Sequence, residues 1–368
     1  MHKPLSVLGL ETSCDETAAA VVHLDADGKA HYLADQIYSQ IDEHTLYGGV
    51  VPEIAARAHV GALDALIKRA LAEADITFAE LDGVAATTGP GLVGGVMVGM
   101  MAAKAIALAH DIPFLPINHL EGHALSPLLS QQGGDEPLSF PYLLLLVSGG
   151  HTQLLSVEGL GRYTRLGSTI DDAAGEAFDK SAKIMGLGFP GGPALERAAQ
   201  KGDASRFCLP RPLTGKPGCD FSFAGLKSAV RRTWEKLPVH DDQARADLAA
   251  AFQAAATDVL ANRTKNAMDI FAKTHGPRPL VVAGGVAANT VLRLRLMKEA
   301  EHRGFTFIAP PLKLCTDNGG MIAHAGALHL RAGYKGDLGI SARPRWPLDE
   351  QAAMARPASG SGKKGPKS

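Results

Sequence analysis

The sequence is poor in cysteine, in aromatic residues and in net charge. Its 368 residues include four cysteines and only 5% aromatic residues, and no two cysteines have Cys-x-x-Cys spacing. So few cysteines exclude a disulfide framework and indicate a reducing compartment. Lys and Arg total 37 against 38 for Asp and Glu. Any contact with nucleic acid must therefore come from local basic groups, such as Arg231 with Arg232, or from partners.

The sequence also lacks a long, uninterrupted apolar run. The N-terminal run at residues 5–10 stops at Glu11, with Asp15 and Glu16 close behind, which is unlike a signal peptide. The apolar stretch at residues 92–109 contains Lys104 and several glycines, which favours a buried helix over a membrane span. We therefore expect a cytoplasmic protein that makes no membrane contact.

Glycine is abundant, with 41 residues, and two of the tight turns that it forms lie in similar surroundings. Residues 6–22 and 143–157 each predict a strand, a turn of small or polar residues, and a returning strand. One such hairpin is weak evidence, but each of these opens one half of the chain. Together they predict a duplicated α/β domain with a phosphate-sized turn in each half.

Two histidines four residues apart are the sharpest local signal. His119 and His123 would lie within about 40° of each other on one helix face, a common way to hold a metal ion. Asp317, in a turn before a helical stretch, offers a third ligand, although Asp at such a position is also a common N-cap. The alternative for the histidines is a pair on a half-exposed face. Two histidines and one carboxylate would leave coordination positions open, as in Lewis-acid or redox iron centres.

Glycine-rich turns form a second group of candidates. The turn at residues 148–152 could cradle a phosphate, and the turns at 188–193 and 283–289 could admit a base or ribose. Each turn alone is better explained as a purely structural turn. The Walker pattern GxxxxGK[ST] is absent from the sequence, which disfavours a P-loop site. Asp179 either accepts hydrogen bonds from a ribose or belongs to a salt-bridged helix surface.

Helical patterns fill the regions between these turns. Residues 52–74 and 241–271 predict helices, and Gly95 with Gly99 gives the 92–109 helix a narrow face for internal packing or for a subunit interface. The tail at residues 343–368 shows no periodicity, which predicts disorder.

Nine motifs follow one another in a single order between Ser6 and Gly339. They lie at residues 10–17 (LETSCDET), 47–53 (YGGVVPE), 89–92 (GPGL), 118–123 (NHLEGH), 147–152 (VSGGHT), 175–180 (GEAFDK), 189–192 (FPGG), 284–286 (GGV) with Asn289, and 315–319 (CTDNG). Together they closely resemble the TsaD family of tRNA N6-adenosine threonylcarbamoyltransferases.

The resemblance implies two duplicated α/β lobes of the actin-like, sugar-kinase/Hsp70 type around a nucleotide cleft. We place the lobes at residues 1–127 and 128–342, followed by the tail. It further implies transfer of a threonylcarbamoyl group from threonylcarbamoyl-AMP to N6 of adenosine 37 in tRNAs that read codons beginning with A. The alternatives are a metallopeptidase, as the histidine pair once suggested for this family, and an actin-fold ATPase or sugar kinase.

The resemblance also assigns residues. His119, His123 and Asp317 match the family's metal ligands, with iron(II) the expected ion and zinc the alternative. The family's substrate-binding positions fall on Leu146, Val147, Ser148, Gly149, Gly150, Asp179, Gly192 and Asn289. No residue is an obvious general base; the candidates are Asp15, Glu16 and His151. The implied partners are tRNA, a shorter actin-fold paralogue (TsaB) that pairs through first-lobe helices, and a small ATPase (TsaE).

Overall fold

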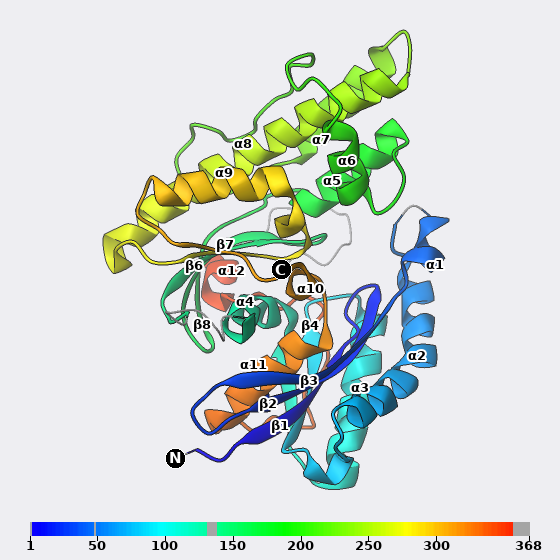
Figure 1. Cartoon of the computed structure of the whole chain (residues 1–368), viewed down its shortest axis with the longest axis vertical. Helices are drawn as coiled ribbons and strands as arrows, with labels where there is room; N and C mark the ends of the chain where they lie inside the picture. Colours follow the sequence, from blue (N-terminus) through cyan, green and yellow to red (C-terminus); the bar gives the residue numbers. More distant parts are fainter. Residues whose placement is uncertain (1, 48, 131–137, 356–368) are drawn as a thin grey trace. The chain divides into compact units, whose positions relative to one another are not determined.

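The chain folds into two units, each with its own five-stranded sheet. The computed structural model describes residues 2–47, 49–130 and 138–355 (Figure 1). Contacts within the chain group Met1–Ser139 with Thr316–Glu350 as the first unit, and Phe140–Cys315 with residues 351–355 as the second.

The first unit is built on a mixed sheet with the strand order β3-β2-β1-β4-β5. The first three strands form an antiparallel meander, and β1, β4 and β5 run parallel. The strands are β1 (Leu5–Glu11), β2 (Glu16–Leu24), β3 (Ala30–Ser39), β4 (Gly83–Gly89) and β5 (Phe114–Asn118). The helices are α1 (Ile41–Thr45), α2 (Pro52–Glu73), η1 (Phe78–Glu80), α3 (Val93–His110), α4 (His119–Ser130) and α11 (Gly319–Arg331).

Alternation along β1 separates the two faces of this sheet. Leu8 and Leu10 belong to the apolar core that includes residues of α2 and α3. Gly9 points the other way, where a Cβ atom would lie 2.3 Å from the backbone nitrogen of Ala323 in α11. Only glycine allows so close an approach, so α11 packs directly on the sheet. Glu11, two residues after Gly9, therefore ends the strand on the α11 face.

The second unit repeats this topology. Its sheet has the order β10-β9-β6-β7-β8, again an antiparallel meander beside three parallel strands. The strands are β6 (Tyr142–Val147), β7 (Thr152–Gly159), β8 (Arg162–Ser168), β9 (Leu280–Ala283) and β10 (Phe307–Ile308). The helices are α5 (Ala174–Met185), α6 (Gly191–Ala199), α7 (Ala224–Lys236), α8 (Asp242–His275), η2 (Gly285–Ala288), α9 (Thr290–Glu301), α10 (Leu312–Cys315) and α12 (Glu350–Ala355). The two predicted hairpins are thus β1–β2 and β6–β7, and the duplication is confirmed.

The observed units differ from the predicted division of the chain. The first extends to residue 139 rather than 127, and residues 316–342, predicted in the second lobe, belong to the first because α11 packs on β1, β2 and β4. The predicted disordered tail is wrong for residues 343–355. Arg343 N donates to Thr88 O at 2.8 Å, Gly91 N donates to Pro344 O at 3.2 Å, and α12 lies further along the chain. Residues 356–368 lie outside the described part of the chain.

Helix α3 packs on one side only. Gly95 and Gly99 are buried, and a Cβ atom on either would lie within 2.5 Å of Thr12. Their narrow face therefore serves internal packing, the first of the two alternatives. Of the described helices, α3 alone has the length and apolar composition to cross a membrane, and 33% of it is buried in the fold. The core helix of a folded protein can have the same length and apolar composition. All four cysteines are free.

Candidate metal centre and nucleotide site

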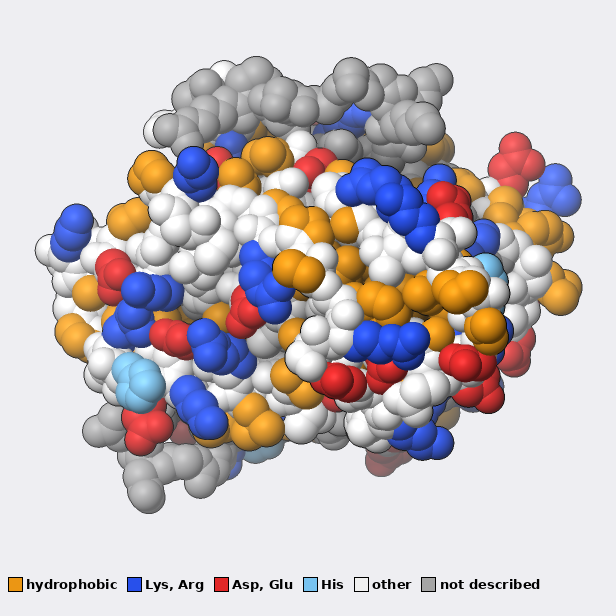
Figure 2. All heavy atoms as spheres, turned by 90° about the horizontal axis from the view of Figure 1, so that it is seen from above, with side chains coloured by type: hydrophobic (Ala, Val, Ile, Leu, Met, Phe, Trp, Pro, Cys, Tyr) orange, Lys and Arg blue, Asp and Glu red, His pale blue; other side chains and the backbone are white. Residues whose placement is uncertain are grey.

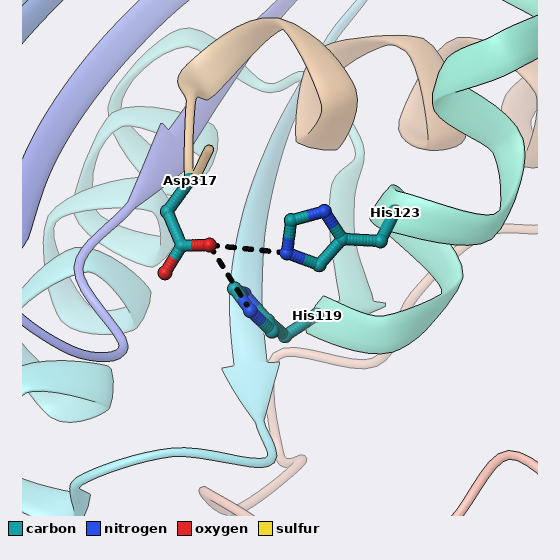
Figure 3. A group of neighbouring side chains, drawn as sticks. All are labelled: His119, His123 and Asp317. Atoms are coloured by element: carbon teal, nitrogen blue, oxygen red, sulfur yellow. Dashed lines mark hydrogen bonds and ion pairs between the residues drawn. The ribbon is translucent and has the colours of Figure 1, made fainter. Parts of the chain in front are cut away.

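Helix α4 carries two of the three candidate metal ligands. It begins at His119, directly after β5, and the Asn118 side chain accepts a hydrogen bond from Leu120 N at 2.9 Å. His119 and His123 project from one face of α4 toward Asp317 (Figure 3). Their Nε2 atoms lie 3.5 and 3.0 Å from Asp317 Oδ1, and the donor atoms of all three residues lie within 4.8 Å of one another.

Asp317 is available because its neighbour performs the capping role. Asn318 is the N-cap of α11, and its side chain accepts a hydrogen bond from Met321 N at 2.8 Å. The alternative in which Asp317 caps this helix is therefore wrong. Its carboxylate instead faces the histidine pair, which gives the two-histidine, one-carboxylate donor set that divalent transition metals bind.

A buried carboxylate contacts the ring nitrogen of His119 that does not face Asp317. His119 Nδ1 lies 2.9 Å from Glu11 Oε2 and 3.2 Å from Ser13 Oγ. Glu11 is fully buried and also accepts hydrogen bonds from Ser13 N and from Thr87 Oγ1. A carboxylate on the second ring nitrogen is the usual support of a histidine that binds a metal through the first. The residues present therefore fit a divalent ion.

The electrostatics of this cluster favour a positive charge. Burial alone would lower the pKa of His119, but the carboxylates of Asp317 and Glu11 raise it to about 9. Desolvation also raises the pKa of Glu16 well above its ordinary value, and the charges of Asp317 and Asp15 raise it further. Glu16 is one of the candidate catalytic residues, and it lies close enough to Asp317 and Asp15 for their charges to change its pKa.

Glu121 lies on a different side of α4 from the histidine pair. Its Oε2 atom is 2.9 Å from His329 Nε2 of α11, in a largely buried contact. Residues two apart on a helix are separated by about 200°, so this placement follows from the sequence spacing.

In the second unit, the predicted phosphate turn joins β6 to β7. Ser148 N donates to His151 O at 2.8 Å, and His151 N donates to Ser148 Oγ at 3.2 Å, so these two residues close the turn. Gly149 and Gly150 between them are exposed, with no atom within 4 Å of the place of a Cβ. Leu146 and Val147, also predicted to contact substrate, are buried at the end of β6.

The segments that carry the other predicted substrate positions begin close to this turn. A Cβ atom on Gly175, at the start of α5, would lie 2.6 Å from Ser148 O, and one on Gly284 would lie 2.4 Å from Val147 O. Asp179 of α5 accepts a hydrogen bond from Gly191 N at 2.9 Å, which places it at the start of α6 beside Gly192. The loop that contains Gly284 leads to Asn289.

Asn289 has a structural role that the sequence did not predict. Its Oδ1 atom accepts a hydrogen bond from Leu292 N and caps α9, and its Nδ2 atom donates to Gln253 Oε1 at 2.9 Å. Glu196 accepts a hydrogen bond from Thr290 N in the same cap region.

Sequence reasoning did not single out Glu11 or Ser13 as supports of His119, or Thr87 as a partner of Glu11. A signal for Glu11 was present, because a carboxylate directly follows the apolar run at residues 7–10 without a break in the strand. No pattern pointed to Thr87, which reaches Glu11 only because β4 pairs with β1.

Two sheets of identical strand order, together with the His–His–Asp group, define an α/β protein of the actin-like class with a candidate metal centre. A solved structure titled full-length HypF in the phosphate- and nucleotide-bound form matches 91% of this chain with a TM-score of 0.55 at 14% identity. This chain spans about half of that protein, 47% of its length, and the likeness concerns the fold alone.

The family model described as TsaD, tRNA N6-adenosine threonylcarbamoyltransferase, matches residues 31–324. A protein of that name from Maricaulis maris is 60% identical over 99% of this chain and 97% of its own length. Another from Rhodospirillum rubrum is 58% identical over 98% and 99%. The chain belongs to the TsaD family of tRNA N6-adenosine threonylcarbamoyltransferases. Membership identifies it as an acyltransferase that modifies tRNA, as predicted, and does not favour the peptidase or kinase alternatives.

Proposed function

We propose that this chain transfers the threonylcarbamoyl group of threonylcarbamoyl-AMP to N6 of adenosine 37 in tRNAs that read codons beginning with A. The observation that carries the proposal is the near-full-length match to the family, joined to an intact His–His–Asp group. The exocyclic amine of adenine is a weak nucleophile, because its lone pair is delocalised into the ring. An activated carbonyl donor with AMP as the leaving group offsets that weakness, and so does alignment of the two substrates.

His119, His123 and Asp317 would hold one divalent metal ion, iron(II) in our proposal, with zinc as the alternative. When bound, such an ion supplies Lewis-acid polarisation of a carbonyl or anchors the threonyl carboxylate and hydroxyl. The chain's own part is to orient the ligands. Glu11 and Ser13 fix the ring of His119, and the position of Asn318 as N-cap leaves Asp317 facing the histidines.

We expect His119→Ala or His123→Ala to abolish tight metal binding and tRNA modification, because either change leaves only two donors. Elemental analysis of the purified variants measures the first loss, and circular dichroism checks that the chain remains folded. His302→Ala, at an exposed histidine of the second unit, is the matched control and should retain full metal content. Full occupancy in either ligand variant would contradict the assignment.

The second unit would bind the adenylate moiety. The exposed glycines of the turn at residues 148–151 offer backbone N–H groups to the phosphate. Asp179 and Gly192, at the start of α6, are placed to contact the nucleoside, and Asn289 would contribute from the cap of α9. His151 remains a candidate general base in this turn, and Asp15 and Glu16 remain candidates beside Asp317.

We further propose that the chain acts in the cytoplasm with tRNA, a TsaB-type paralogue and a TsaE-type ATPase. In the face drawn in Figure 2, Lys and Arg side chains lie among acidic side chains rather than in one continuous area, so tRNA contacts would be local. The paralogue would pair through the outer sides of α2 and α3, where Val60, Met97 and Met101 are exposed.

Mass spectrometry tests the reaction directly. The purified chain and its partners would be incubated with unmodified tRNA and threonylcarbamoyl-AMP, and the digested nucleosides analysed for N6-threonylcarbamoyladenosine. We expect the product with the wild type and its loss with His123→Ala. Absence of the product with a metal-loaded wild type and its partners would contradict the proposed reaction.

A further inference from the structure

Glu11 is not one of the three candidate metal ligands, but it contacts one of them, His119, directly. It is a fully buried carboxylate at the end of β1, and it makes no contact with solvent that would compensate its charge. An ionised carboxylate in such a place is costly unless hydrogen bonds satisfy it. Its two oxygens have different partners, and this difference defines its role.

The first oxygen, Oε1, accepts a hydrogen bond from the backbone N–H of Ser13 at 2.6 Å. A backbone N–H is always a donor, so this oxygen must remain an acceptor. The second oxygen, Oε2, faces His119 Nδ1 at 2.9 Å and the hydroxyl of Thr87. Because a carboxylate only accepts, Nδ1 of His119 must carry the proton that lies between them.

With a proton fixed on Nδ1, the neutral ring, which is the form that binds a metal ion, has its lone pair on Nε2. That is the nitrogen that faces Asp317 Oδ1, at 3.5 Å, beside Nε2 of His123. We propose that Glu11 is a positioning residue that sets the His119 tautomer, so that Nε2 is the nitrogen presented to a divalent metal ion. This inference rests on the metal role proposed above for His119, His123 and Asp317.

Glu11→Gln is a sharp test, because the surroundings dictate how the amide must sit. The Ser13 N–H requires the amide oxygen at the Oε1 position, so the NH₂ group takes the place of Oε2. It would then donate to His119 Nδ1 and force the ring proton onto Nε2, which blocks the metal-facing nitrogen. Loss of such a supporting partner typically weakens metal binding by about 10–100-fold.

The experiment is a titration of the full-length, metal-free chain with Zn²⁺ against a chromophoric chelator. We expect Glu11→Gln to bind Zn²⁺ about 10–100-fold more weakly than the wild type. Thr87→Val removes a different donor from the same oxygen, and Glu121→Gln removes a charge from the ligand-bearing helix without touching a ligand. Both controls should stay close to the wild type.

A second measurement needs no variant. In the Zn²⁺-loaded wild type labelled with ¹⁵N-histidine, NMR should show a protonated Nδ1 and a zinc-bound Nε2 at His119. Zinc on Nδ1, or an unchanged Zn²⁺ affinity in folded Glu11→Gln, would overturn this proposal and leave the metal site intact. A drop of equal size in Glu121→Gln would also overturn it, since charge alone would then explain the effect. A wild type that binds no Zn²⁺ would overturn the metal role as well.

Discussion

Two histidines of the first unit illustrate how burial and charge compete at single side chains. Burial lowers the pKa of both. For His119 the carboxylates of Asp317 and Glu11 reverse that effect and raise the pKa to about 9. His324, fully enclosed on α11, has only a hydrogen bond to the backbone carbonyl of Leu125 to oppose desolvation, and its pKa falls to about 4. The first environment attracts a cation, whereas the second keeps an imidazole neutral.

The lowered pKa of His324 predicts a loss of stability in acid. Between pH 6.5 and 4 the unfolded chain binds a proton at this residue that the folded chain does not. The free energy of unfolding therefore falls as the pH falls through this window. Replacing the ring with His324→Gln should flatten the pH dependence, with a difference from wild type of roughly 2 kcal/mol between pH 7 and pH 5.

Urea denaturation of both proteins across this pH range measures the effect. The comparison removes the contributions of all other titrating groups, which the two proteins share. Curves that stay parallel from pH 7 to pH 4 would contradict the burial argument. His302→Gln, at an exposed histidine, is the control and should follow the wild type.

Sequence reasoning identified the histidine pair at this site through its local spacing. The i, i+4 relation of His119 and His123 fixes their common helix face, and the position of Glu121 follows from the same geometry. Glu11 and Thr87 come from two different strands. Thr87 reaches Glu11 through the pairing of β4 with β1, and Glu11 contacts His119 through the packing of α4. Such long-range contacts leave no periodic signal in a single sequence, which is why the contact of Glu11 with His119 was found only in the structure.

At the scale of single elements, the placement of Glu121 on α4 distinguishes a transferase from a zincin-type peptidase. In a zincin helix the catalytic Glu follows the first histidine directly and acts on metal-bound water. Glu121 instead contacts His329 of α11, and its side chain is engaged there. We expect Glu121→Gln to keep its metal content and most of its tRNA-modifying activity, with a stability loss of about 1 kcal/mol from the weakened contact.

Elemental analysis and the modification assay on this variant provide the measurement. A peptidase with Glu121 as its base would lose roughly two to four orders of magnitude in activity. Metal-dependent peptide cleavage by the wild type that disappears in Glu121→Gln would contradict the assignment.

Helix α3 shows how one element can serve the core and a partner with different faces. Gly95 and Gly99 pack against Thr12, so a bulky residue at Gly95 would disturb the fold and report nothing about a partner. The outer face carries Met97 and Met101, which are 47% and 53% exposed. We expect Met101→Glu to weaken pairing with the TsaB-type paralogue by more than about tenfold, because it places a charge in an apolar contact.

Sedimentation velocity with the purified paralogue measures this pairing. Met354→Glu changes an exposed methionine on α12 of the second unit and should leave the pairing unchanged. Equal pairing by Met101→Glu and the wild type would show that the partner uses another surface.

For the whole molecule, the duplication could be predicted from the sequence, but the return of residues 316–350 to the first unit could not. Two strand–turn–strand patterns at residues 6–22 and 143–157 indicated two equivalent sheets, and both have the same strand order. No comparable sequence pattern indicates this return. Its cause is tertiary, because Gly9 and Gly319 allow α11 to pack on the first sheet. The same return carries residues 343–346, which have no helical or strand periodicity, into ordered contacts.

These contacts predict that residues 343–346 stabilise the first unit. Arg343 N donates to Thr88 O, Gly91 N to Pro344 O, and the buried amide of Asn118 to Trp346 O at 2.9 Å. Three such hydrogen bonds contribute roughly 2–4 kcal/mol. Asn118 also caps α4 through Leu120, so their loss should lower metal affinity as well as stability.

Two truncated chains distinguish the effect of this segment from that of α12. A chain that ends at residue 349 keeps all three hydrogen bonds and lacks α12, whereas a chain that ends at residue 342 lacks both. We expect the shorter chain to unfold at a lower urea concentration and to bind Zn²⁺ more weakly than the longer one. In the shorter chain the buried amide of Asn118 loses its acceptor, the carbonyl of Trp346. The side chain of Asn118 also caps α4, which carries His119 and His123. Identical urea midpoints and Zn²⁺ affinities for the two chains would show that the segment contributes nothing to the site.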